Sequence, residues 1–145
     1  MDKTFKLVLL LLAISLIAFF LLGCAKQAAK SDNEKLTGYQ KITPVVVKER
    51  LDKGEKLIIV DVRTKEEYDS GHIANSLLIP YDEIEKKAPA LLTDKNAAII
   101  VYCRTGRRSA DAVQKLESLG YTNLRDLGGI LSWPYEIEGD FEGHF

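Results

Sequence analysis

Short, unbroken apolar runs separated by helical patterns are the feature that most constrains the fold of this 145-residue chain. The clearest runs cover residues 57–60 and 97–102, and a shorter one covers residues 77–79. Continuous runs of this kind are typical of parallel strands that are buried on both faces, because helices cover both sides of the sheet. The sequence therefore predicts an α/β fold with a central, mainly parallel sheet and helices on both faces.

Capping residues and helix-stopping residues mark the segments between these runs. The expected helices cover residues 45–53, 64–71 with a capping box from Thr64 to Glu67, 82–92 with an interruption at Pro89, and 109–119 with Ser109 as the cap. We further expect a short strand over residues 123–127, a sharp turn at Gly128 and Gly129, and a helical turn over 130–135. The length of the chain suits one ordinary domain and not two, and we expect that domain over residues 38–145.

The N-terminal segment has the pattern of an export signal. Two lysines precede an apolar run over residues 7–22, and a small residue, Gly23, closes the run. The sequence Leu21-Leu22-Gly23-Cys24 resembles the lipobox of bacterial lipoproteins. That resemblance implies cleavage before Cys24 and attachment of lipid to its thiol, and an uncleaved signal anchor is the alternative.

These features divide the chain into three parts. Residues 1–23 are the expected lipoprotein signal peptide, residues 24–37 the lipidated N-terminus and a flexible tether, and residues 38–145 the folded domain. We expect the domain to be anchored to a membrane by this lipid and to face the periplasm or the cell exterior.

Charge and histidine content exclude several classes of partner. The chain has 20 basic and 21 acidic residues and a net charge of −1, so it lacks the basic surface that nucleic-acid binding requires. His72 and His144 are far in sequence from each other and from both cysteines. No metal site and no cofactor is predicted.

Cys103 directly follows the strand expected over residues 97–102 and begins the run Cys103-Arg104-Thr105-Gly106-Arg107-Arg108-Ser109. Ligands of parallel α/β sheets bind beyond the carboxyl ends of the strands. The thiolate is the reactive form of cysteine, and the three arginines, the start of the next helix and a backbone nest at Gly106 all favour an anion there. Cys103 is therefore the predicted nucleophile, with a buried structural cysteine as the alternative.

The same run resembles the active-site loop of single-domain rhodaneses, written Cys-Arg-x-Gly-x-Arg-Ser, and matches all five specified positions. Two more stretches resemble the family: Asp61-Val62-Arg63 with Glu67-Tyr68, Gly71-His72-Ile73, Asn75-Ser76 and Ile79-Pro80, and then Leu127-Gly128-Gly129-Ile130 with Trp133. The three stretches lie within residues 39–139. The resemblance implies the three-layer rhodanese-like fold.

It also implies a ping-pong sulfurtransferase. In this family the catalytic cysteine, here Cys103, takes sulfur from thiosulfate or a similar anion, carries it as a persulfide and passes it to a thiol or to cyanide. The implied donor-binding residues are Arg104, Thr105, Gly106, Arg107, Arg108 and Ser109. Asp61 and Arg63 are expected to form hydrogen bonds near the site, whereas His72 and Trp133 are expected to be chiefly structural.

Two other functions are compatible with the sequence. Phosphatases and arsenate reductases of related fold use Cys-x5-Arg, but here Ser109 occupies the sixth position and Arg108 the fifth. The shorter loop fits a sulfur atom better than a phosphate. A non-catalytic rhodanese-like binding module is the second alternative, although such modules usually lack the cysteine.

Overall fold

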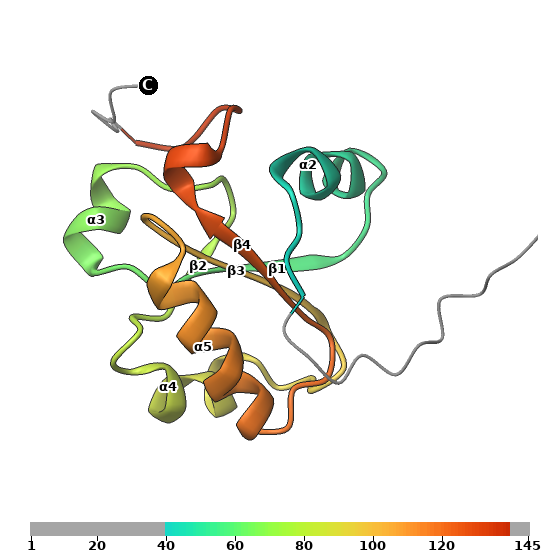
Figure 1. The fold of residues 1–145 in the computed structure, drawn as a ribbon, viewed down its shortest axis with the longest axis vertical. Coiled ribbons are helices and arrows are strands. Elements are labelled where there is room, and N and C mark those ends of the chain that lie inside the picture. The colour runs from blue at the N-terminus through green and yellow to red at the C-terminus, as the bar shows by residue number, and fades with distance from the viewer. Residues whose placement is uncertain (1–39, 140–145) are drawn as a thin grey trace, which may run out of the picture. The chain divides into compact units, whose positions relative to one another are not determined.

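The computed structural model describes residues 40–139, in which four strands form one sheet with helices around it (Figure 1). The elements in chain order are α2 (Pro44–Asp52), β1 (Leu57–Asp61), α3 (Lys65–Ser70), β2 (Leu77–Leu78), α4 (Ile84–Leu91), β3 (Ala98–Cys103), α5 (Arg107–Ser118), β4 (Leu124–Gly129) and the 3₁₀ turn η1 (Ile130–Ser132). No helix within residues 40–139 is long and apolar enough to span a membrane.

The sheet has the order β2-β1-β3-β4, and all three strand pairs are parallel. β1 and β3 are therefore the central strands, as their unbroken apolar sequences predict. Their register places Asp61 opposite Tyr102 at the carboxyl end of the sheet. The predicted mainly parallel sheet is confirmed.

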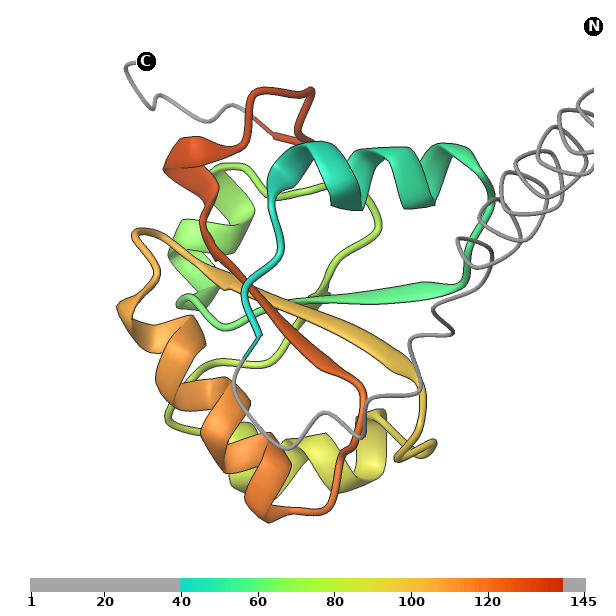
Figure 2. The same cartoon turned by 45° about the vertical axis from the view of Figure 1, so that its right-hand side comes forward.

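Helices cover the sheet on both faces (Figure 2). Along β3, Ile99 and Val101 pack in one core with α4 and α5, whereas Ile100 and Tyr102 pack in a second core with α2 and Trp133. This alternation follows from the period of two along a strand. The three-layer architecture is confirmed, and Trp133 is core, as expected.

The helix that follows Cys103 begins earlier than the sequence predicts. α5 starts at Arg107 with Gly106 as its N-cap, so Ser109 lies inside the first turn and is not the cap. Gly106 has φ of 107°, a conformation that glycine adopts without steric cost and that turns the chain directly into the helix. The prediction of a Ser109 cap is wrong, and both Arg107 and Arg108 belong to the helix.

The two glycines after residue 127 belong to β4 and do not form the predicted sharp turn. Val101 pairs with Asp126 and Tyr102 pairs with Gly128, which leaves Leu127 as the extra residue of a β-bulge. Gly128 has φ of 87°, and its N–H donates to Asp126 Oδ1 at 2.9 Å. The bulge lets β4 continue to Gly129, opposite Cys103.

Two helices differ in how well the sequence predicts them. The capping box of α3 is present, because Thr64 Oγ1 accepts from the Glu67 N–H and Glu67 accepts from the Thr64 N–H. The predicted interruption at Pro89 does not occur, since α4 runs through that residue. Pro89 lies near the end of α4, where it removes a single intrahelical hydrogen bond.

Candidate active site

Cys103 is the last residue of β3 and its side chain lies in the core shared with α4 and α5. The residue is 1% exposed, and the Gly106 N–H donates to its Sγ at 3.1 Å. The Sγ lies 3.8 Å from Ser109 Oγ. The sulfur therefore lies buried at the floor of the turn that leads into α5.

This turn packs closely against β4. The Ser109 hydroxyl is buried and lies 3.1 Å from the Gly106 carbonyl oxygen and 3.2 Å from that of Gly128, so it is held by the backbone. A Cβ on Gly129 would lie only 2.4 Å from the Arg104 carbonyl oxygen. The turn is thus fixed by contacts that need a hydroxyl at one position and a glycine at the other.

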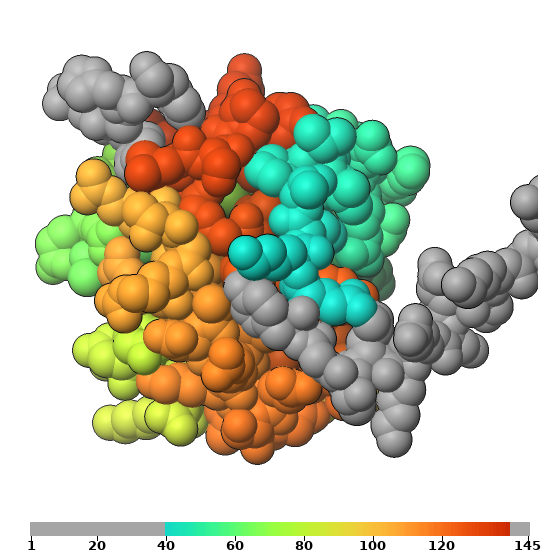
Figure 3. All heavy atoms as spheres, viewed as in Figure 1, coloured from blue at the N-terminus to red at the C-terminus, as the bar shows by residue number. Residues whose placement is uncertain are grey.

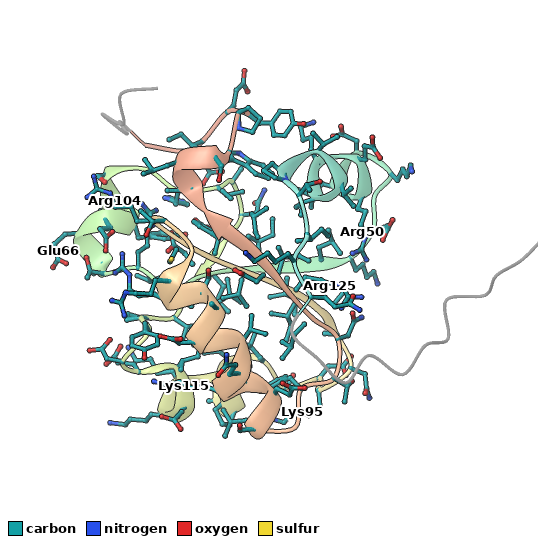
Figure 4. All side chains as sticks on the ribbon, in the orientation of Figure 1. Arg50, Glu66, Lys95, Arg104, Lys115 and Arg125 are labelled. Carbon is teal, nitrogen blue, oxygen red and sulfur yellow. The ribbon has the colours of Figure 1, made fainter. Side chains whose placement is uncertain are left out.

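Arg104, Thr105 and Arg107 form the exposed rim of the site. Figure 4 shows Arg104 at the end of the molecule that carries α3, where Glu66 is labelled. The segment after β3 lies at the surface beside η1 (Figure 3), and the Leu131 N–H donates to the Arg104 carbonyl. Within residues 40–139 neither rim arginine forms an ion pair, so both charges face solvent.

Arg108 is bound differently from the other two arginines. Its two terminal nitrogens donate to both carboxylate oxygens of Glu67 on α3, at 2.7 and 2.8 Å. The hydrogen bond from Arg108 is the main reason that the pKa of Glu67 falls to about 2. This bidentate pair joins the first turn of α5 to α3.

Asp61 and Arg63 form a buried ion pair behind the site. Their side chains are 0% and 1% exposed, and Arg63 Nε and Nη2 donate to the Asp61 carboxylate at 2.7 to 3.0 Å. Arg63 Nη2 also donates to the Gly71 carbonyl at 2.7 Å, which ties the end of α3 to β1. Neither side chain forms a hydrogen bond with Cys103.

The Tyr102 hydroxyl connects this region to the next loop. It accepts from the Ile73 N–H and lies 3.1 Å from Ser76 Oγ. Burial, together with the nearby Asp61 charge, raises the pKa of Tyr102, so its hydroxyl stays protonated.

The structure brings together the predicted residues 103–109 and places Asp61 and Arg63 one strand away. His72 lies apart from them: its ring stacks on Tyr68, and its nitrogens lie close to the Tyr68 carbonyl and the Glu138 carboxylate. Cys24 is outside the described residues. Residues 40–139 contain no cluster of His, Cys, Asp and Glu that could hold a metal ion.

Sequence reasoning missed Glu67 as part of the site. The spacing from Thr64 identified it as a capping residue, and that role is real. Its bond to Arg108 joins residues 41 positions apart, and no local pattern reveals such a contact. The available signal was the place of Glu67 in the second stretch of family resemblance.

Comparison with known proteins agrees with this geometry. Residues 43–135 match the rhodanese-like domain family. Thiosulfate sulfurtransferase PspE of Escherichia coli is 35% identical over 71 residues, which are 49% of this chain and 68% of PspE. The probable adenylyltransferase/sulfurtransferase MoeZ of Mycobacterium tuberculosis is 33% identical over 117 residues, which are 80% of this chain and only 28% of MoeZ.

A solved structure gives the same result for the fold. The rhodanese-like domain of the Anabaena protein Alr3790 superposes with a TM-score of 0.65 at 30% identity, covering 70% of this chain and 80% of that one. The region that matches the family contains the sheet, the turn after β3 and α5. The chain therefore belongs to the rhodanese-like domain family.

Proposed function

We propose that this protein is a sulfurtransferase that carries sulfane sulfur as a persulfide on Cys103. The observation that carries the proposal is the placement of the Cys103 sulfur at the floor of the turn after β3, where the Gly106 N–H donates to it. Relatives with this domain, PspE and MoeZ among them, are named as sulfurtransferases, which supports the reaction class.

The first half-reaction uses an anionic donor such as thiosulfate. The Cys103 thiolate attacks the outer sulfur, a new S–S bond forms, and the old S–S bond breaks to release sulfite with its electron pair. The N–H groups of residues 107–109 are the first of α5 and lack intrahelical partners, so they and the helix dipole favour negative charge at the sulfur. No proton and no external oxidant is needed.

The second half-reaction returns the cysteine to its starting state. An acceptor thiolate or cyanide attacks the outer sulfur of the persulfide, and Cys103 leaves as the thiolate. The chain has two cysteines, and Cys103 is the free cysteine of the described residues. A persulfide on Cys103 therefore waits for an acceptor from another molecule, since no resolving thiol lies beside it in this part of the chain.

The test is the intact mass of the full-length protein in detergent after incubation with thiosulfate. We expect a gain of one sulfur atom that added cyanide removes with release of thiocyanate. Cys103→Ser should show no gain, whereas Cys24→Ser should behave as the parent. A parent protein without the adduct, or an equal adduct in Cys103→Ser, would refute the proposed function.

We also infer from the N-terminal sequence that lipid on Cys24 attaches the protein to a membrane and that the domain faces the periplasm or the cell exterior. The order of positive residues, apolar run and Gly23-Cys24 supports this. Metabolic labelling with a fatty acid should mark the parent and spare Cys24→Ser. Equal labelling of both proteins would contradict lipid attachment at this residue.

A further inference from the structure

The three arginines near Cys103 do not carry the same free charge. Arg108 is paired with Glu67 through two short hydrogen bonds, and the two side chains are only 23% and 26% exposed. This end-on fork uses one N–H group on each terminal nitrogen and places the full charge of a carboxylate against the guanidinium. A second anion that approaches Arg108 therefore meets a guanidinium whose positive charge the Glu67 carboxylate already balances.

Glu67 is itself held firmly in place. Its carboxylate accepts the Thr64 N–H at 3.1 Å as part of the capping box of α3. The far end of the helix is tied down through the hydrogen bond of Arg63 to the Gly71 carbonyl, and the Tyr68 hydroxyl donates to the Ser76 carbonyl at 2.7 Å. α3 is therefore a fixed support, and Glu67 stays ionised at any physiological pH because its pKa is about 2.

Arg104 and Arg107 differ from Arg108 in their exposure and, in the described part of the chain, in their lack of a carboxylate partner. Both are exposed, and neither has a carboxylate partner within residues 40–139. Arg108 lies within electrostatic range of Cys103, but the Glu67 carboxylate lies in direct contact with it. The pair together contributes almost no net charge at the mouth of the site.

We propose that Glu67 is a positioning residue that holds Arg108 against α3 and cancels its charge, so that Arg104 and Arg107 are the cations that attract an anionic reagent to Cys103. The identification of that reagent as a sulfur donor rests on the proposed function. The charge assignment itself does not, and it can be tested without sulfur transfer.

The test compares alkylation of Cys103 by iodoacetate, an anion, and by iodoacetamide, which is neutral. Full-length protein in detergent with Cys24→Ser has Cys103 as its single cysteine, and intact mass gives both rates. The ratio of the two rates reports the charge near the sulfur, because changes in exposure or intrinsic reactivity affect both reagents alike.

Glu67→Gln should raise this ratio by roughly 2- to 5-fold, the effect of one unit charge acting through largely aqueous surroundings. Arg104→Gln and Arg107→Gln should each lower it by a similar factor. The double change Glu67→Gln with Arg108→Gln removes a neutral pair and should leave the ratio close to that of the parent.

Asp69→Asn is the matched control. It removes a carboxylate from the same helix, where Asp69 pairs with Lys65 and not with Arg108, so it alters net charge equally and should leave the ratio unchanged. Glu67→Asp keeps the negative charge and should also stay near the parent. Melting curves of each variant identify any protein that has not folded, and the double variant tests the assignment even if Glu67→Gln does not fold.

Two results would overturn the inference. If the double variant lowered the ratio as far as Arg104→Gln does, Arg108 would be a free cation of the site. If Glu67→Gln slowed both reagents equally and left the ratio unchanged, Glu67 would have a purely structural role. Absence of a thiosulfate adduct in the parent would refute the proposed sulfur transfer while these ratios still decide the charge assignment.

Discussion

Gly129→Ala should damage the reactive turn more than it damages the fold. Gly129 has φ of −110° and ψ of 143°, an extended conformation that alanine adopts without strain. The added Cβ, however, would lie 2.4 Å from the Arg104 carbonyl oxygen and 2.7 Å from the Thr105 Cα. The carbonyl oxygen must retreat by about 1 Å to reach the 3.4 Å at which ordinary contact begins.

The size of this displacement sets two expected effects. Overpacking of this kind costs about 1–3 kcal/mol of unfolding free energy. A cost of about 2 kcal/mol corresponds to a fall in Tm of about 8–16 °C for a domain of this size. A displacement of about 1 Å in the groups that cradle Cys103 should slow persulfide formation by about 100-fold.

The assay is the rate of sulfur-adduct formation with thiosulfate, followed by intact mass, together with thermal unfolding followed by circular dichroism. Gly120→Ala is the control, because Gly120 has φ of 88° and no atom within 4 Å of the added Cβ. That change should cost about 1–2 kcal/mol through backbone strain and leave the rate unchanged. A Gly129→Ala protein that forms the adduct within about twofold of the parent rate would refute the argument, since it would show that the turn does not depend on this close approach.

Three other predictions concern stability. Asp61→Asn should lower the free energy of unfolding in urea by about 3 kcal/mol, because Arg63 stays 1% exposed without its carboxylate partner. A loss below about 1 kcal/mol would show that the introduced amide and water replace the pair. Glu67 has a pKa lowered from 4.5 to about 2, so its contribution to stability is complete above pH 4.5 and is lost as the pH falls to about 2. The stability difference between the parent and Glu67→Gln should therefore shrink across that pH range, and a constant difference would contradict the Arg108 pair as its cause. Tyr102→Phe should lower the free energy of unfolding by about 1–3 kcal/mol, because the Ile73 N–H and Ser76 Oγ lose a buried partner. Differential scanning calorimetry measures the effect, and an unchanged Tm would show that water replaces the hydroxyl.

The central fold could be predicted because its causes are local in sequence. The apolar run of β3 has no polar interruption, so it must be buried on both faces, and that requirement alone leads to a sheet between two helical layers. The capping box of α3 could also be predicted, since both of its hydrogen bonds join residues three positions apart.

The start of α5 could not be predicted in the same way. Serine is a strong N-cap residue, and nothing near Ser109 in sequence argues against that role. In the structure the Ser109 hydroxyl instead lies against carbonyl oxygens of Gly106 and, across the sheet, of Gly128. The Gly128 carbonyl is within reach because the bulge at Leu127 lets β4 continue beside the turn. A bulge of one residue cannot be recognised from the hydrophobic pattern of the sequence.

The charge of the site is a second property that the local sequence predicts only in part. Three arginines within five positions of Cys103 indicate an anion site, and this conclusion needs only the local sequence. Which of the three arginines keep a free charge depends on α3, because α3 carries Glu67. The buried hydrogen bond from Arg63 to the Gly71 carbonyl helps to hold α3 in place. The sequence of the loop does not reveal Glu67, so a count of the arginines in the loop overestimates the positive charge that an anionic donor meets. Two chains with identical loops would therefore attract anions to different degrees if only one of them carried this carboxylate.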